Sequence, residues 1–210
     1  MKITLLNDNP QSWILPFIER LKNELTGYQV NHIYDLNDIK KGDIMFILSC
    51  EKIISQKYLK FHKNNIVVHP SKLPLGKGWS PLAWQLLEGK NEIPVSLFEA
   101  SDKLDAGDVY LVKSIKLEGH ELNDEIKNKQ GLITIDMIKY YLNNYDQMMG
   151  ISQTGEETFY HRRTQKHSEL DIDKSLKEQF NLLRVVDNER YPAYFYFDNK
   201  KYILKVYKED

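Results

Sequence analysis

The sequence is poor in cysteine: its 210 residues include one, Cys50. A single thiol forms neither an internal disulfide nor a multi-cysteine zinc site, and it is typical of proteins from a reducing compartment. No run of about 18 apolar residues occurs, and the apolar run at the N-terminus is too short for a signal peptide. These absences favour an intracellular globular protein, which we expect to be cytoplasmic.

The chain also lacks an excess of charge of either sign. It has 29 Lys and Arg against 30 Asp and Glu, a formal net charge of -1. Proteins that coat nucleic acid or an anionic membrane carry a surplus of basic residues. We therefore expect neither nucleic acid nor a membrane as a partner. The 41% hydrophobic content is ordinary for a globular protein with a buried core.

Short apolar runs alternate with helical spacing over the first 70 residues. Strands are expected over 3–6, 28–34, 44–48 and 66–69, and helices over 13–25 and 52–62, the first with Ser12 as its N-cap. Strands that alternate with helices indicate right-handed βαβ units. The sequence thus predicts an α/β fold with a Rossmann-like, doubly wound sheet.

The remaining residues predict a different arrangement. We expect helices over 80–88, 121–144 and 174–186, strands over 93–98 and 109–117, and a hairpin whose strands flank Asp198-Asn199-Lys200. Gly131 lies inside the long helix and is a possible break. We expect a catalytic domain over 1–150 and a C-terminal extension over 151–210 with a linker, a small helix and the β-hairpin.

Two residues stand out as candidates for proton transfer. His69 ends an apolar strand, and ligands of open α/β sheets bind at that end of the strands. Asp105 lies in a loop between two expected strands, close to Gly107. A carboxylate beside an imidazole orients it and raises its basicity. Alone, each residue is more often structural, since a strand-end histidine usually packs and an Asp-Ala-Gly sequence is usually a turn.

Two separated blocks of residues resemble a known family. The first block comprises His69-Pro70-Ser71, Leu73-Pro74, Gly78, Pro81, Trp84, Gly89, Val95-Ser96-Leu97 and Leu104-Asp105-Ala106-Gly107. The second comprises Arg162-Arg163-Thr164, Ser168, Leu170-Asp171, 182–186 and Tyr191-Pro192-Ala193. Together these motifs resemble the 10-formyltetrahydrofolate-dependent formyltransferase superfamily, most closely the bacterial sugar N-formyltransferases of the pseudaminic acid type.

The resemblance implies an enzyme that moves a formyl group from 10-formyltetrahydrofolate to an amine. It implies that His69 stabilises the oxygen or moves the proton of the tetrahedral centre, and that Asp105 orients His69 and helps take the proton from the attacking nitrogen. It also implies that the pterin lies against two loops. The residues expected to bind it are Ser49 and Cys50, and Ala100, Ser101 and Leu104.

One residue departs from the family pattern. The family usually has asparagine two residues before the histidine, as an oxyanion donor, and this chain has Val67 there. Asn65 lies about 13 Å from His69 along an extended strand, so it replaces that donor only if the strand bulges. Three interpretations stay open: a bulge that brings Asn65 forward, a donor elsewhere such as a backbone N–H or Ser71, or an inactive relative.

The expected acceptor is a nucleotide-linked amino sugar of the 4-amino-4,6-dideoxy type, used for surface glycan or flagellin sugars. Charge balance and the length of the chain disfavour tRNA, and the Arg162-Arg163-Thr164 block resembles the sugar and tRNA branches more than glycinamide ribonucleotide formyltransferase, which remains an alternative. Asn9, Lys77 and Trp79 are the candidate acceptor-binding residues, Lys77 for a diphosphate and Trp79 for stacking.

Other features carry less chemistry. The histidine pairs lack the spacing of a helix-borne zinc site, so no metal is expected. Cys50 is expected to be a small buried residue rather than a nucleophile. Arg162 and Arg163 are expected to form structural ion pairs. The aromatic C-terminal hairpin suits an interface, and it predicts a homodimer.

Overall fold

The computed structural model describes residues 1–209, and its centre is a six-stranded mixed sheet in the order β2-β1-β3-β4-β6-β7. The strands are β1 (Lys2–Leu6), β2 (Gln29–Ile33), β3 (Gly42–Ile47), β4 (His62–His69), β6 (Glu92–Glu99) and β7 (Val109–Lys116). β1 to β4 pair in parallel, whereas β6 and β7 join antiparallel. The predicted α/β, Rossmann-like class is confirmed, with an antiparallel edge.

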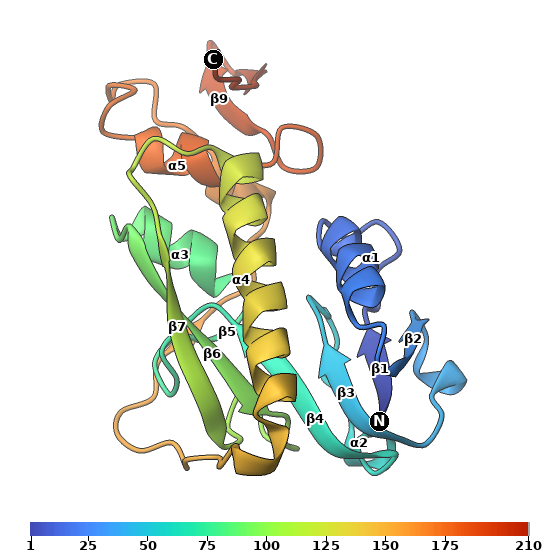
Figure 1. The fold of residues 1–210 in the computed structure, drawn as a ribbon. Helices are drawn as coiled ribbons and strands as arrows, with labels where there is room; N and C mark the ends of the chain where they lie inside the picture. Colours follow the sequence, from blue (N-terminus) through green and yellow to red (C-terminus); the bar gives the residue numbers. More distant parts are fainter. Residues whose placement is uncertain (210) are drawn as a thin grey trace.

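Helices cover both faces of the sheet. The long helix α4 (Asn123–Asn143) and α1 (Leu15–Glu24) lie side by side on one face (Figure 1), over a core that includes Phe46, Ile66 and Tyr141. The short α2 (Gln56–Leu59) closes a smaller cluster on the other face. Residues of β3 alternate between the two clusters, because successive side chains of a strand point to opposite faces.

Several helices differ from the expected bounds. α1 begins at Leu15, not after Ser12, and its N-cap Ile14 makes no side-chain cap; Pro16 stands in the first turn, where its missing N–H costs nothing. α2 is shorter than predicted. The C-terminal helix α5 is limited to Phe180–Val185, because the residues before it form turns around Gln179. α3 covers Pro81–Leu87, close to the prediction.

Gly131 does not break α4, which is continuous through it. A Cβ built on Gly131 would lie 2.4 Å from Cδ1 of Phe17, on the neighbouring helix. The glycine therefore lets α1 and α4 approach closely, and this packing outweighs its weak helix propensity.

We expect Gly131→Ala to destabilise the protein, although alanine is the better helix former by about 1 kcal/mol. Overpacking against the Phe17 ring costs about 1–3 kcal/mol, which exceeds that gain. Thermal unfolding should show a Tm lower by a few degrees. Gly27→Ala is the control, since nothing lies within 4 Å of its added Cβ. Equal Tm values for the two variants would contradict this account of the helix pair.

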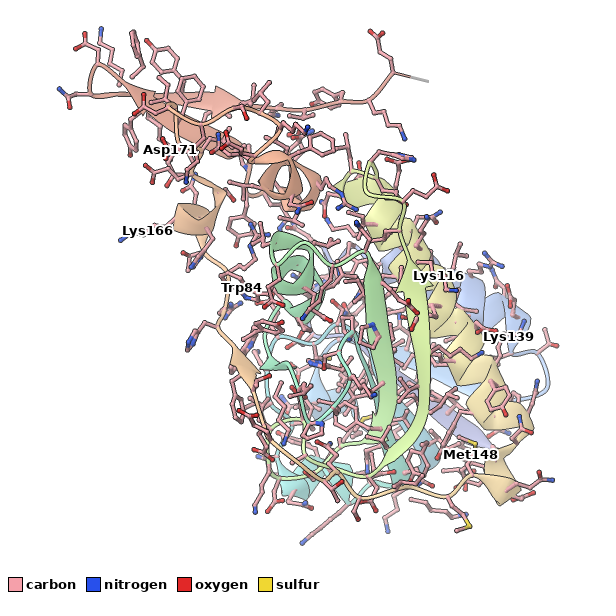
Figure 2. The ribbon with its side chains drawn as sticks, turned by 90° about the vertical axis from the view of Figure 1, so that its left-hand side faces the viewer. Trp84, Lys116, Lys139, Met148, Lys166 and Asp171 are labelled. Atoms are coloured by element: carbon pink, nitrogen blue, oxygen red, sulfur yellow. The ribbon has the colours of Figure 1, made fainter. Side chains whose placement is uncertain are left out.

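The C-terminal segment runs back along the sheet domain to a separate hairpin. Its start is tied to α3: the Trp84 ring stacks on Tyr160 and its indole N–H donates to the His161 carbonyl at 2.8 Å (Figure 2). Two short strands, β5 (Lys77–Gly78) and β8 (Phe159–Tyr160), pair in parallel there. The predicted hairpin is present, with β9 (Ala193–Phe197) and β10 (Lys200–Leu204) joined through Asp198 and Asn199.

The hairpin lies above α5, at the far end of the molecule from the N-terminus (Figure 1). One face packs on a small core that includes Leu170, Leu183 and Val186. Of the helices in residues 1–209, none has the length and apolar composition needed to cross a bilayer.

Candidate active site

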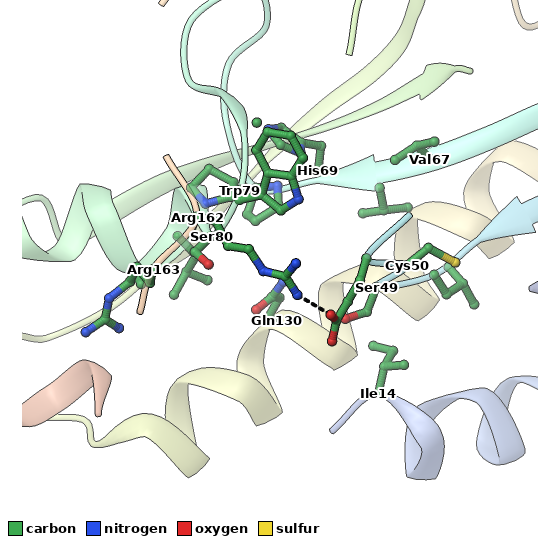
Figure 3. A pocket seen from close by; sticks show the side chains of 18 of the residues that line it. Ile14, Ser49, Cys50, Val67, His69, Trp79, Ser80, Gln130, Arg162 and Arg163 are labelled. Atoms are coloured by element: carbon green, nitrogen blue, oxygen red, sulfur yellow. Dashed lines mark hydrogen bonds and ion pairs between the residues drawn. The ribbon is translucent and has the colours of Figure 1, made fainter. Parts of the chain in front are cut away.

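A cavity of about 470 Å³ opens where β3 and β4 end, beside the segment that joins β1 to α1. Because these strands are parallel, their C-terminal ends meet at one edge, where ligands of doubly wound sheets bind. Loops after β3, β4 and β6 form one side of the cavity, and α4 with the 162–191 segment forms the other (Figure 3).

His69 is the last residue of β4 and is 7% exposed. Its Nε2 lies 2.9 Å from the carbonyl oxygen of Gly76, and its ring packs edge-on against Phe98. A carbonyl only accepts, so this contact places the proton of a neutral imidazole on Nε2. The strand end and the Gly76 carbonyl together fix the ring at the wall of the cavity.

Asp105 reaches the same point from the β6–β7 loop. Its Oδ2 lies 3.8 Å from Nε2 of His69 and accepts the backbone N–H of Gly78 at 2.8 Å. Asp105 has φ of 47°, a left-handed conformation that aspartate adopts more readily than most residues. The structure therefore brings His69 and Asp105 together, as the sequence predicted, at a distance that a small shift closes to a hydrogen bond.

The Asp105 loop is held by its neighbours. Nε2 of Gln153 donates to the carbonyls of Asp105 at 2.9 Å and of Gly107 at 2.8 Å. A Cβ on Gly107 would lie 1.8 Å from the Glu99 carbonyl, so only glycine allows this approach. Gln153 is a contact that sequence reasoning missed, since it lies 48 residues from Asp105.

All five residues predicted to bind the pterin line this one cavity: Ser49, Cys50, Ala100, Ser101 and Leu104. Val67, Ile54 and Phe98 add apolar walls beside them. Within residues 1–209, the backbone N–H groups of 101–104 donate no hydrogen bond. Apolar walls with free backbone donors at the edge fit a flat ring with polar edges, such as a pterin.

Cys50 is half-buried, with its thiol 3.5 Å from the Leu6 carbonyl. Burial, together with the nearby Asp8 carboxylate, raises the pKa of Cys50 to about 12. The thiol therefore stays protonated at neutral pH, which agrees with the expectation that it is not a nucleophile.

Cys50 should resist alkylation in the folded protein. With a pKa of about 12, about one thiol in ten thousand is ionised at pH 8. Iodoacetamide at pH 8 should modify it slowly, and at least a hundredfold faster in urea, where the pKa returns to about 8.5. Mass spectrometry of timed samples measures both rates, and equal rates would contradict the assigned environment.

Asn65 does not reach His69. β4 pairs in continuous register with β3 through Asn65 and Val67, and with β6 from Ile66 to His69, so no bulge brings Asn65 forward. Its Nδ2 donates instead to the Leu59 carbonyl at 3.1 Å. It is absent from the residues that line the cavity, whereas Val67 is among them. The bulge interpretation is wrong, and the other two stay open.

Of the three candidate acceptor-binding residues, Trp79 lines the cavity beside His69 (Figure 3). Lys77 does not: it is 1% exposed and its Nζ lies 2.6 Å from Oε1 of Glu157. The pairing of β5 with β8 turns Lys77 away from the cavity, so its proposed contact with a diphosphate is wrong. Asn9 lies outside the lining, and its Nδ2 donates to Oε1 of Glu51 at 3.3 Å.

The far wall of the cavity was not predicted. Asn123, Lys127, Gln130 and Thr134 recur every three or four residues and form a polar stripe along α4. Arg162 extends across the cavity and forms an ion pair with Glu51 (Figure 3). The helical spacing of the stripe was visible in the sequence, but nothing local showed that it faced a cavity. Residues 1–209 contain no cluster of ligands able to hold a metal ion.

The family model described as formyl transferase matches residues 23–131, more than half of the chain. The chain belongs to this family. His69 and Asp105, and the loops after β3 and β6, all lie within the matched residues.

Curated relatives agree with this assignment. A methionyl-tRNA formyltransferase from Finegoldia magna is 30% identical over 67% of this chain and 42% of its own length. Curated relatives include several such enzymes, and the chain spans 33% to 61% of the length of those it matches.

The fold has close neighbours among solved structures. A methionyl-tRNA formyltransferase from Clostridium thermocellum has a TM-score of 0.85 at 21% identity and covers 100% of this chain and 94% of its own. A 4-N formyltransferase from Francisella tularensis has a TM-score of 0.78 at 18% identity and covers 100% of this chain and 98% of its own. HypX from Aquifex aeolicus in complex with tetrahydrofolic acid has a TM-score of 0.78 at 19% identity and covers 98% of this chain and 37% of its own. At these identities the likeness supports the fold alone.

Proposed function

We propose that this protein transfers a formyl group from 10-formyltetrahydrofolate to the amino group of a nucleotide-linked amino sugar of the 4-amino-4,6-dideoxy type. The observation that carries the proposal is the placement of His69 and Asp105 in one cavity with the loops of Ser49–Cys50 and Ala100–Leu104. 10-Formyltetrahydrofolate would supply the activated formyl carbon, and the apolar walls beside Val67 would hold its pterin.

The chemistry requires a base and a hydrogen-bond donor at one point. An amine that attacks a formyl carbon becomes an ammonium and must lose a proton, while the formyl oxygen gains negative charge. His69 is fixed at the cavity wall and Asp105 is 3.8 Å away, so the pair can accept that proton and return it to the leaving nitrogen. Since Asn65 is remote, the oxyanion donor in this proposal is His69 itself, a backbone N–H of the cavity or the Ser71 hydroxyl.

The acceptor assignment rests on the far wall of the cavity. Its amides and guanidinium groups suit an acceptor with hydroxyl and phosphate groups. A 4-N formyltransferase and other sugar N-formyltransferases share the fold. In this proposal residues 1–150 carry the catalytic pair and the donor loops, and the 151–210 extension supplies part of the acceptor wall.

Product formation tests the proposal. The protein is incubated with 10-formyltetrahydrofolate and a panel of UDP- and dTDP-linked amino sugars, with glycinamide ribonucleotide as the competing acceptor, and products are weighed by mass spectrometry. We expect one formyl group on an amino sugar. Formylation of glycinamide ribonucleotide alone would overturn the acceptor. Binding of folate and sugar nucleotide without product would favour the inactive relative that Val67 suggests.

We also propose that the protein is a homodimer through the hairpin. The outer face of the hairpin carries Tyr196, which is 49% exposed, and Ile203, which is 51% exposed. Apolar side chains of this size in one patch are typical of an interface. Ile203→Lys should shift the mass measured by light scattering from dimer to monomer, with Ile172→Lys, an equally exposed isoleucine outside the hairpin, as the control. A mass unchanged by Ile203→Lys would contradict this role.

A further inference from the structure

Positive charge is concentrated in the cavity of an otherwise balanced chain. Its lining includes six basic residues and three acids. The basic residues are Lys52, Lys103, Lys127, Arg162, Arg163 and Arg190, and the acids are Glu51, Asp105 and Asp187. Low-dielectric walls focus such a surplus on whatever occupies the cavity, so the site favours an anion.

Arg162 is the cation best placed to meet a ligand. It enters from the C-terminal segment, crosses the cavity above Gln130 and ends at the Glu51 carboxylate (Figure 3). Its side chain is 62% exposed and that of Glu51 is 45% exposed. Exposed ion pairs of this kind contribute little to stability, so a stronger anion replaces Glu51 at low cost.

Arg163, the next residue, has no acidic partner within residues 1–209. Its guanidinium donates to the carbonyls of Val185 and His167, and its Nε is buried without a partner. Burial lowers the pKa of this group, and no carboxylate of the described residues offsets that effect. An anion bound at this wall would therefore stabilise the half-buried charge of Arg163.

We propose that Arg162 forms the subsite for a phosphate group of the acceptor, that Arg163 adds positive charge at the same wall, and that Glu51 is the resting counter-ion that this phosphate displaces. The inference rests on the proposed function, because it places the acceptor in this cavity. A guanidinium pairs with phosphate oxygens through two parallel hydrogen bonds. Lys77 forms an ion pair with Glu157, so it does not supply the positive charge that a phosphate needs here. The arginines come from the wall opposite the donor loops (Figure 3).

Calorimetric titration with UDP, dTDP and inorganic pyrophosphate tests the subsite without any turnover. We expect Arg162→Gln to weaken their binding about tenfold or more, as loss of a charged hydrogen bond does. Glu51→Gln should tighten it, because it releases Arg162. Arg20→Gln is the control, since Arg20 is an exposed arginine paired with Glu24 on α1.

A titration with 5-formyltetrahydrofolate separates the other source of anionic oxygens, the glutamate carboxylates of the folate. Its affinity should be the same in Arg162→Gln and wild type. Three results would overturn the subsite. Arg162→Gln could weaken only the binding of 5-formyltetrahydrofolate, it could bind the nucleotides as tightly as wild type, or wild type could bind none of the phosphate probes. Phosphate binding that depends on Arg162 in a protein without formyl transfer would sustain the subsite and overturn the proposed function.

Discussion

His69→Ala should lower the rate of formyl transfer about a thousandfold, within the range that loss of a general acid–base residue costs. The imidazole is fixed by the Gly76 carbonyl at 2.9 Å and by the Phe98 ring, so no other side chain replaces it when it is removed. The rate is measured under saturating 10-formyltetrahydrofolate and amino sugar nucleotide, which separates turnover from binding.

The controls for this variant address folding and specificity. His69 is 7% exposed, and its loss leaves the Gly76 carbonyl without a partner at a cost of about 1 kcal/mol. His69→Asn is the second variant, because its amide is also a donor. His120→Ala removes an exposed histidine paired with Glu118, and it should keep full activity. A rate within tenfold of wild type for folded His69→Ala would contradict the assigned role.

Asp105→Asn should lower turnover about a hundredfold or more while the protein keeps its Tm. Asparagine tolerates the left-handed backbone at φ of 47°, and its amide oxygen still accepts the Gly78 N–H. The substitution therefore removes the negative charge near His69 without the backbone strain that alanine adds. Loss of that charge removes a base for the attacking nitrogen and a group that orients the imidazole.

Asp108→Asn is the matched control, three residues further along, where the carboxylate accepts the Ser152 hydroxyl and lies at the surface. It should leave the rate unchanged. If Asp105→Asn and Asp108→Asn have the same rate, the carboxylate of Asp105 takes no part in the reaction, and the His69–Asp105 pair is wrong.

The sequence predicted those parts of the fold that depend on local patterns. Alternating apolar runs located all six strands of the sheet, and the rule that ligands bind at the C-terminal ends of parallel strands placed His69 in the cavity. The Asp198-Asn199 turn located the hairpin, since both residues tolerate the positive φ values that such a turn requires.

The errors have a common cause in contacts between distant residues. The assignment of Lys77 to a diphosphate rests on its charge and its place in the irregular loop after His69. The pairing of β5 with β8, some 80 residues away, instead buries Lys77 against Glu157. The low helix propensity of Gly131 predicts a possible break in α4. The helix is continuous instead, and the glycine is there because the Phe17 ring of α1 leaves no room for a side chain. Asn65 depended on a bulge that the register of β4 excludes.

The most direct measurement is the mass of the acceptor after incubation with 10-formyltetrahydrofolate, for wild type and for Asp105→Asn in parallel. We expect an amino sugar nucleotide heavier by one formyl group with the wild-type protein and almost none with the variant. An unchanged acceptor mass across the whole panel, from protein that binds folate and is folded, would contradict it.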